Sequence, residues 1–195
     1  SSRAMKVFFG YGLKVQVSGL AGTINFQLDK LLLGGFLNVG YVALYELGSK
    51  VALFIRSIPM LFLPPIMPAA SELRAINNLE DLDKLYWRAS KYIVFFSTAS
   101  AFFIAGLAPV IMFVWMGKFG FESSILTIRI LAIGYFFNIV TGVITSVARG
   151  IGVPQYEMRS SILMVIMNTI LSIILIKKIG FPGALIGTTV SMTIG

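Results

Sequence analysis

The chain has 195 residues, of which 57% are hydrophobic and 12% are charged. Soluble domains average about 45–50% apolar and about 25% charged residues. The composition therefore indicates an integral membrane protein without a soluble domain. It has no His and no Cys, which excludes His-based acid–base catalysis, Cys–His sites, disulfides and the usual zinc ligands, and we expect no catalytic residue, metal or cofactor. The net charge of +8 is scattered among apolar runs, which favours cytoplasmic loops or an anionic ligand over nucleic acid.

Apolar runs of about 20 residues recur along the chain and predict an all-α polytopic protein. We expect about five complete transmembrane helices and the start of a sixth near Pro182. The second is long, is kinked by Pro59 and has Pro64 and Pro65 near its end. The chain begins without Met and ends inside an apolar run, so we expect it to be an internal piece of a longer protein. The five complete spans are Met5–Phe26, Val39–Pro68, Ala89–Met116, Ser124–Ala148 and Ser160–Ile176.

The long connection between the second and third spans is Ser71–Arg88. Asn78 can cap a helix, with Glu80 and Asp81 in its first turn. The pattern is typical of a short amphipathic helix on the membrane surface, although a solvated linker helix fits it equally well. Its apolar stripe consists of Leu79, Leu82, Leu85 and Tyr86.

The distribution of Lys and Arg over the short loops predicts the orientation of the chain. One set of loops holds eight of these residues: Arg3, Lys6, Arg74, Lys84, Arg88, Lys91, Arg149 and Arg159. The opposite set holds four: Lys30, Lys118, Lys177 and Lys178. We therefore expect the first set, the N-terminus and the 71–88 loop to face the cytoplasm.

Four of the spans carry polar residues at helical spacing, which places them on one face of each helix. A lipid-facing helix has no use for such stripes, so we expect these helices to surround a shared polar interior. The stripes are Lys14, Ser18 and Asn25, which Asp29 joins if the helix continues so far; Glu46, Lys50 and Ser57; Asn138, Thr141, Thr145 and Arg149; and Glu157, Ser161, Asn168 and Ser172.

Two cations lie too deep in their spans to reach the membrane surface easily, and they are the candidates for binding a substrate in a cavity. Lys14 is about nine residues into its span, and Arg56 lies past the middle of its own. Asn25 and Asn138 join them as candidate cavity residues. We expect Arg129 only to extend to the surface, and Arg149 to be a positive-inside anchor.

Three further charges are candidates for a coupling or a structural role. Glu46 and Lys50 are four residues apart, which favours mutual neutralisation. A purely structural pair and a coupling or binding role are equally open for them. Asp29 and Lys30 are expected in a short turn between two spans, where both reach water, so a loop or cap role for Asp29 is favoured over a proton or cation site.

Five segments carry a resemblance to a known family: LDKLLLGGFLNVGYVALYELGSKV, PPIMPAASEL with NNLEDLDKLYWRASKY, WMGKFGFESSILTIRILAIGYFF, ARGIGVPQYEMRSSILMVIMN and GFPGALIGTTVS. In their order and spacing they resemble polysaccharide biosynthesis flippases of the multidrug/oligosaccharidyl-lipid/polysaccharide exporter superfamily. The resemblance implies a MATE-like transporter of about twelve to fourteen helices in two pseudo-symmetric lobes. Residues 1–195 then form a partial second lobe, and the first lobe is missing.

The resemblance also implies a function. A polyprenyl-diphosphate-linked oligosaccharide is turned across the cytoplasmic membrane of a prokaryote by alternating access, for cell-surface polysaccharide biosynthesis. The cavity of the family is typically cationic, which implies Lys14 and Arg56 as contacts of the diphosphate. A multidrug or cation antiporter and a lipid II flippase are the alternatives, and a glycan polymerase or glycosyltransferase is a lower one. The partners expected are the lipid-linked glycan, membrane lipids and the first lobe.

Overall fold

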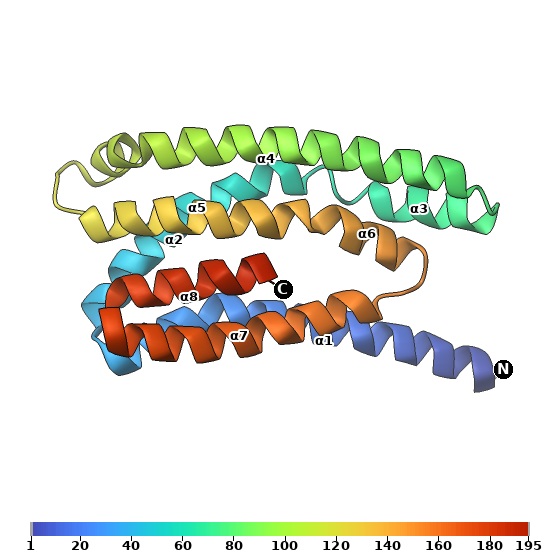
Figure 1. The fold of residues 1–195 in the computed structure, drawn as a ribbon, viewed down its shortest axis with the longest axis horizontal. Coiled ribbons are helices and arrows are strands. Elements are labelled where there is room, and N and C mark those ends of the chain that lie inside the picture. The colour runs from blue at the N-terminus through green and yellow to red at the C-terminus, as the bar shows by residue number, and fades with distance from the viewer. Residues whose placement is uncertain (1, 195) are drawn as a thin grey trace.

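The computed structural model describes residues 2–194, and these residues form a bundle of helices without a strand (Figure 1). This confirms the predicted all-α class. Three helical stretches are long and apolar enough to cross a membrane: Leu79–Met116, Glu122–Gly150, which joins two helices, and Gln155–Ile179. The helices are α1 (Ser2–Phe36), α2 (Val39–Met60), α3 (Ile66–Ala75), α4 (Leu79–Met116), α5 (Glu122–Val140), α6 (Gly142–Gly150), α7 (Gln155–Ile179) and α8 (Phe181–Ile194).

The long helices run back and forth, so that the connections gather at the two ends of the bundle (Figure 1). The start of α1, the α3–α4 turn and the α6–α7 turn lie at one end. The α1–α2, α4–α5 and α7–α8 turns lie at the other. This is the grouping of loops expected from the sequence, although the side chains of Arg3 and Lys6 lie outside the described part. Which end faces the cytoplasm stays a prediction.

The first helix differs from the prediction. α1 continues through Asp29 and Lys30 to Phe36, so the expected turn at these two residues is wrong. The chain reverses instead at Leu37–Asn38, where Asn38 caps α2 by accepting a hydrogen bond from the Tyr41 amide. Asp29 is fully buried inside the bundle rather than in contact with water.

Two of the predicted spans are each broken into two helices. The second span divides into α2 and α3, because the residues after Pro59 form a turn that holds Pro64 and Pro65. The fourth span divides at Thr141 into α5 and α6. The two short halves then pack on each other: a Cβ on Gly150 of α6 would lie 2.4 Å from the Met67 carbonyl oxygen of α3.

The expected separate helix in 71–88 is also wrong. The Asn78 cap is confirmed, because its side-chain oxygen accepts from the Asp81 amide at 3.1 Å. The helix that starts there, however, continues without a break to Met116 as α4. Its first 27 residues contain neither Gly nor Pro, so nothing in the sequence ends the helix where it enters the apolar span.

Glycines allow the closest approaches between helices. A Cβ on Gly48 of α2 would lie 2.5 Å from the Ser124 carbonyl oxygen of α5 and 2.6 Å from Thr127 Cβ. On α8, a Cβ on Gly183 would meet the α7 backbone at Leu175 at 2.3 Å. Small residues at such crossings are the usual means of packing helices in membranes. The main core closes around them with buried residues that include Ile55, Ile128, Leu131 and Leu185.

We expect the Gly48→Ala substitution to lower the melting temperature of the full-length protein in detergent, because the added methyl has to separate α2 from α5. The matched control is Gly106→Ala on α4, where nothing lies within 4 Å of an added Cβ. The control should leave the melting temperature unchanged or raise it, since Ala favours a helix over Gly by about 1 kcal/mol. Equal effects at both positions would contradict the tight α2–α5 contact.

Candidate functional site

A cavity of about 660 Å³ opens where the broken helices meet α1 and α7. Its lining mixes polar and apolar residues from α1, α2, α3, α5, α6, α7 and the α2–α3 turn. Three charged residues are among them: Arg56, Arg149 and Glu157. The polar residues of the lining are Ser18, Thr23, Asn138, Thr141, Thr145, Ser146, Ser160 and Ser161.

The bend between α5 and α6 gives the cavity part of its wall. The Thr141 hydroxyl donates to the Asn138 carbonyl at 2.9 Å, and the hydroxyls of Thr145 and Ser146 donate to the Gly142 carbonyl. Hydroxyls that donate back to the preceding turn loosen the helical ladder and often bend a helix. All four residues of the polar stripe predicted on the fourth span therefore line the cavity: Asn138, Thr141, Thr145 and Arg149.

Arg56 is the cation of the cavity without an acidic partner among residues 2–194. Its guanidinium carbon lies 5.0 Å from the centre of the Phe26 ring, which also lines the cavity. Its Nε is buried and has no hydrogen-bond partner within the described residues. Arg56 thus has donor capacity for an anion and a stacking contact that holds its plane in place.

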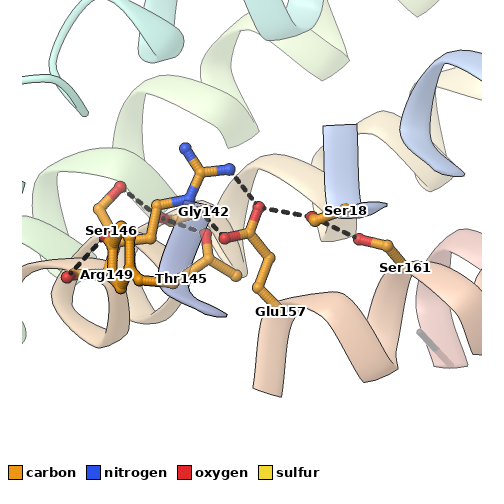
Figure 2. Close-up of polar contacts among 8 residues, drawn as sticks. Ser18, Gly142, Thr145, Ser146, Arg149, Glu157 and Ser161 are labelled. Carbon is orange, nitrogen blue, oxygen red and sulfur yellow. Dashed lines mark hydrogen bonds and ion pairs between the residues drawn. The ribbon is translucent and has the colours of Figure 1, made fainter. Parts of the chain in front are cut away.

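Arg149 and Glu157 form a two-pronged ion pair at the end of the cavity near the α6–α7 turn. Arg149 Nε donates to Glu157 Oε2, and Nη2 donates to Oε1 (Figure 2). Glu157 Oε1 also accepts from the Ser18 hydroxyl of α1 at 2.9 Å, and Ser18 Oγ lies 3.0 Å from Ser161 Oγ. The backbone carbonyl of Arg149 accepts from the Tyr11 hydroxyl at 3.1 Å. The pair therefore connects α6, α7 and α1.

A second polar group lies sealed between α1, α2, α7 and α8. Asp29 is 0% exposed and accepts hydrogen bonds from the Tyr45 and Thr188 hydroxyls at 2.6 Å each. Asn168 Nδ2 lies 3.4 Å from Asp29 Oδ1 and donates to Asn25 Oδ1 at 3.0 Å. All these partners are neutral, so within the described residues the carboxylate is held by hydrogen bonds rather than by an ion pair.

The predicted stripes of the first and fifth spans therefore meet face to face. We call this contact the α1–α7 polar seam; it consists of Ser18, Asn25 and Asp29 of α1 with Glu157, Ser161, Asn168 and Ser172 of α7. One end of the seam opens into the cavity, and the other is closed by α2 and α8. The shared polar interior expected from the sequence is thus partly a cavity and partly a buried contact. The stripe predicted on the second span, Glu46, Lys50 and Ser57, belongs to neither, so for that span the prediction is wrong.

The four residues expected to bind a substrate occupy three different places. Arg56 and Asn138 line the cavity. Asn25 lies in the sealed part of the seam, where it is 0% exposed and its Nδ2 has no hydrogen-bond partner within the described residues. Lys14 is half-buried and does not belong to the cavity lining.

The expected pairing of Glu46 with Lys50 is confirmed, and a second, nearer cation joins it. Lys50 Nζ lies 3.8 Å from Glu46 Oε1, whereas Lys30 Nζ of α1 lies 2.6 Å from Glu46 Oε2. The nearer cation comes from another helix, which sequence spacing along α2 could not reveal. Within residues 2–194, no group of three or more His, Cys, Asp or Glu side chains could hold a metal ion.

Two residues at these sites were not singled out from the sequence, and two others were predicted in a different role. Tyr45 and Thr188 donate to Asp29, and their only sequence signal is a hydroxyl inside an apolar run. Glu157 was expected only as a member of a polar stripe, yet it is the acid of the cavity. Arg149 lies in the cavity wall rather than acting only as an anchor at the membrane surface.

Comparison with known proteins gives a family for this arrangement. The sequence model of the family described as "Polysaccharide biosynthesis protein" matches residues 1–119. A "Probable low-salt glycan biosynthesis flippase" of Haloferax volcanii is 23% identical over 195 residues, which is 100% of this chain and 41% of that protein. "Probable flippase AglR" of the same organism is 22% identical over 175 residues, or 86% of this chain and 36% of that protein.

The fold also matches a solved structure. The crystal structure of a MATE mutant matches 100% of this chain and 44% of its own with a TM-score of 0.88 at 17% identity. At that identity the likeness shows the fold alone, and the fold is MATE-like. The chain spans about two fifths of the length of the curated relatives that it matches.

The sealed cluster around Asp29 predicts a stability effect. The Thr188→Val substitution keeps the shape of the side chain but removes the hydroxyl that donates to Asp29, so we expect it to destabilise the full-length protein by about 1–2 kcal/mol. The matched control is Thr193→Val on the same helix, whose exposed hydroxyl donates to the Thr189 carbonyl one turn earlier. Thermal unfolding in detergent checks this, and a control as harmful as the test variant would contradict it.

Proposed function

The chain belongs to the polysaccharide biosynthesis protein family, and on this premise we propose that the whole protein is a membrane transporter that translocates polyprenyl-diphosphate-linked oligosaccharides by alternating access. The proposed direction is from the cytoplasmic to the outer leaflet of a prokaryotic cell membrane, for cell-surface polysaccharide biosynthesis. This chain is then a partial second lobe, with its N-terminus and residues 71–88 on the cytoplasmic side. The first lobe belongs to the same longer chain.

The observation that carries this proposal is Arg56. An arginine in the wall of a cavity between membrane helices is costly to keep, so it is retained where it has a role. Among residues 2–194 this one has no acidic partner, and its Nε is buried without an acceptor. Arginine recognises phosphate oxygens with paired donors, which fits the diphosphate of a lipid-linked glycan. The neighbouring hydroxyls of Thr141, Thr145 and Ser146 suit sugar or phosphate oxygens.

The same charges weigh against an antiporter of cationic drugs. Such a carrier should present a free acid to its cavity, whereas the acid that lines this one, Glu157, is neutralised by Arg149. A lipid II flippase handles the same diphosphate group, so the cavity charge does not separate it from the proposed function. The names of the two Haloferax relatives, both flippases and one for glycan biosynthesis, support the glycan substrate.

Of the three residues considered for coupling, Asp29 is the one that we retain. Glu46 lies within ion-pair distance of Lys30 and Lys50, which favours a structural role. Asp29 accepts hydrogen bonds only from neutral donors and forms no ion pair within the described residues.

We expect Arg56→Gln to slow translocation by about 10-fold to 100-fold, because a charge-assisted contact to phosphate is worth about 1.5–3 kcal/mol. The measurement uses the full-length protein in proteoliposomes. A fluorescent polyprenyl-diphosphate oligosaccharide is loaded, and its leaflet exposure is followed with a membrane-impermeant quencher.

The matched control is Arg129→Gln, at an exposed arginine outside the cavity, and it should translocate like the wild type. Unimpaired translocation by Arg56→Gln would remove Arg56 from the site. Efflux of a cationic dye by the wild type, without translocation of the glycan, would overturn the proposed function in favour of the antiporter.

Lys14 stays a prediction from the sequence. We expect Lys14→Ala to abolish translocation in the same assay while leaving the amount of protein in the membrane unchanged. There are two physical reasons. Lys14 is half-buried more than three turns into α1, and it lies one helical turn from Ser18, which lines the cavity. Normal export by this variant would exclude Lys14 from the substrate path.

A further inference from the structure

The Arg149–Glu157 pair has features that a simple surface bridge lacks. Both side chains line the cavity, and they stand on either side of the turn that joins α6 to α7. The Glu157 side chain is only 14% exposed. Separating such a partly buried pair leaves each charge without its counter-charge, which is unfavourable unless another ion takes the place of the lost partner.

Arg149 retains donor capacity while it is paired. Its Nε and Nη2 are directed at Glu157, whereas the other terminal nitrogen of the guanidinium points away from the carboxylate (Figure 2). A guanidinium has five N–H donors, so this free edge can accept a second oxyanion before the first one leaves. The pair can thus open by exchange of one anion for another, without an intermediate in which Arg149 is alone.

The Glu157 carboxylate also keeps hydrogen-bond donors when it is no longer paired with Arg149. Ser18 donates to Glu157 Oε1 at 2.9 Å, and the Ser161 hydroxyl lies 3.0 Å from Ser18 Oγ. These two hydroxyls belong to the α1–α7 polar seam and do not depend on Arg149. They leave the carboxylate hydrogen-bonded when its cation turns to another anion, which lowers the cost of exchange.

We propose that Arg149 is a second anion-binding residue of the cavity and that Glu157 is its resident counter-ion, which the diphosphate of the substrate displaces and which later displaces the diphosphate. This inference rests on the proposed function for the identity of the anion. In the empty cavity Glu157 neutralises Arg149; in the loaded cavity the diphosphate, with more charge and more acceptor oxygens, takes its place. On release, the carboxylate returns and drives the anion out.

The competing role for the pair is a clamp that only fixes the α6–α7 turn. A clamp and a counter-ion predict opposite results when Glu157 loses its charge but keeps its size. A clamp that is broken costs stability and leaves the affinity for anions unchanged. A counter-ion that is removed leaves Arg149 open to the incoming anion, so the affinity rises.

The test measures the Kd of inorganic diphosphate for the full-length protein in detergent by calorimetry. We expect Glu157→Gln to tighten binding by about tenfold, because it removes an anion that competes for Arg149, and Arg149→Gln to weaken binding by about tenfold, because it removes a charge-assisted contact. In proteoliposomes Glu157→Gln should translocate the glycan more slowly than the wild type despite its tighter binding, because no internal anion releases the diphosphate.

Arg129→Gln is the matched control for Arg149→Gln and should leave the Kd unchanged. If Glu157→Gln does not accumulate in the membrane, Glu157→Asp takes its place in the test. Its side chain is one methylene shorter, which disrupts the two-pronged geometry, so it should also tighten diphosphate binding, by a smaller factor. An unchanged Kd in the Glu157 variant, or unchanged binding by Arg149→Gln, overturns the exchange.

The outcomes separate this inference from the function on which it rests. Tighter diphosphate binding by Glu157→Gln, with no translocation of the glycan by the wild type, supports the exchange and contradicts the proposed function. Normal translocation by the wild type, together with a lower melting temperature and an unchanged Kd in Glu157→Gln, supports the function and shows that the pair is a clamp.

Discussion

The structure depends on one constraint: inside a bilayer, polar groups find their partners within the protein because water is absent. The α1–α7 polar seam is the consequence. Asn168 reaches both Asn25 and Asp29, and Ser172 donates to Asn168 at 2.7 Å. Each of these groups alone would oppose insertion of its helix, whereas together they hold two helices that are far apart in the sequence in one register.

The seam passes from a sealed environment to an open one. At the sealed end, Asp29 is surrounded by neutral donors from α2, α7 and α8. At the open end, Glu157 faces the cavity and meets Arg149. The buried end of the seam thus joins α1 to α7 behind the cavity, and the charges that we propose to change partners lie at its open end.

Much of the site was present in the sequence as a pattern. Helical spacing selected Ser18, Asn25 and Asp29 on α1 and Glu157, Ser161, Asn168 and Ser172 on α7, and these are the residues that meet. The pattern did not reveal that Asp29 is buried within a continuous α1, because Thr188 satisfies it from 159 residues away. Nor did it show that the nearer partner of Glu46 is Lys30. Spacing along one helix carries no information about which helix lies opposite.

The sequence by itself determined the class of protein: apolar runs required membrane helices, and the lack of His and Cys excluded the usual catalytic and metal sites. Local chemistry also fixed the Asn78 cap and the prolines that divide α2 from α3. Only the tertiary structure decided the partner of each charge. The sequence predicts Arg149 to be an anchor at the membrane surface. In the structure Arg149 lines the cavity, because α6 bends away from α5 and brings Arg149 to Glu157. The hydroxyls that favour this bend lie on the same segment, but the partner that Arg149 meets belongs to α7, and spacing along one segment does not reveal which helix lies opposite.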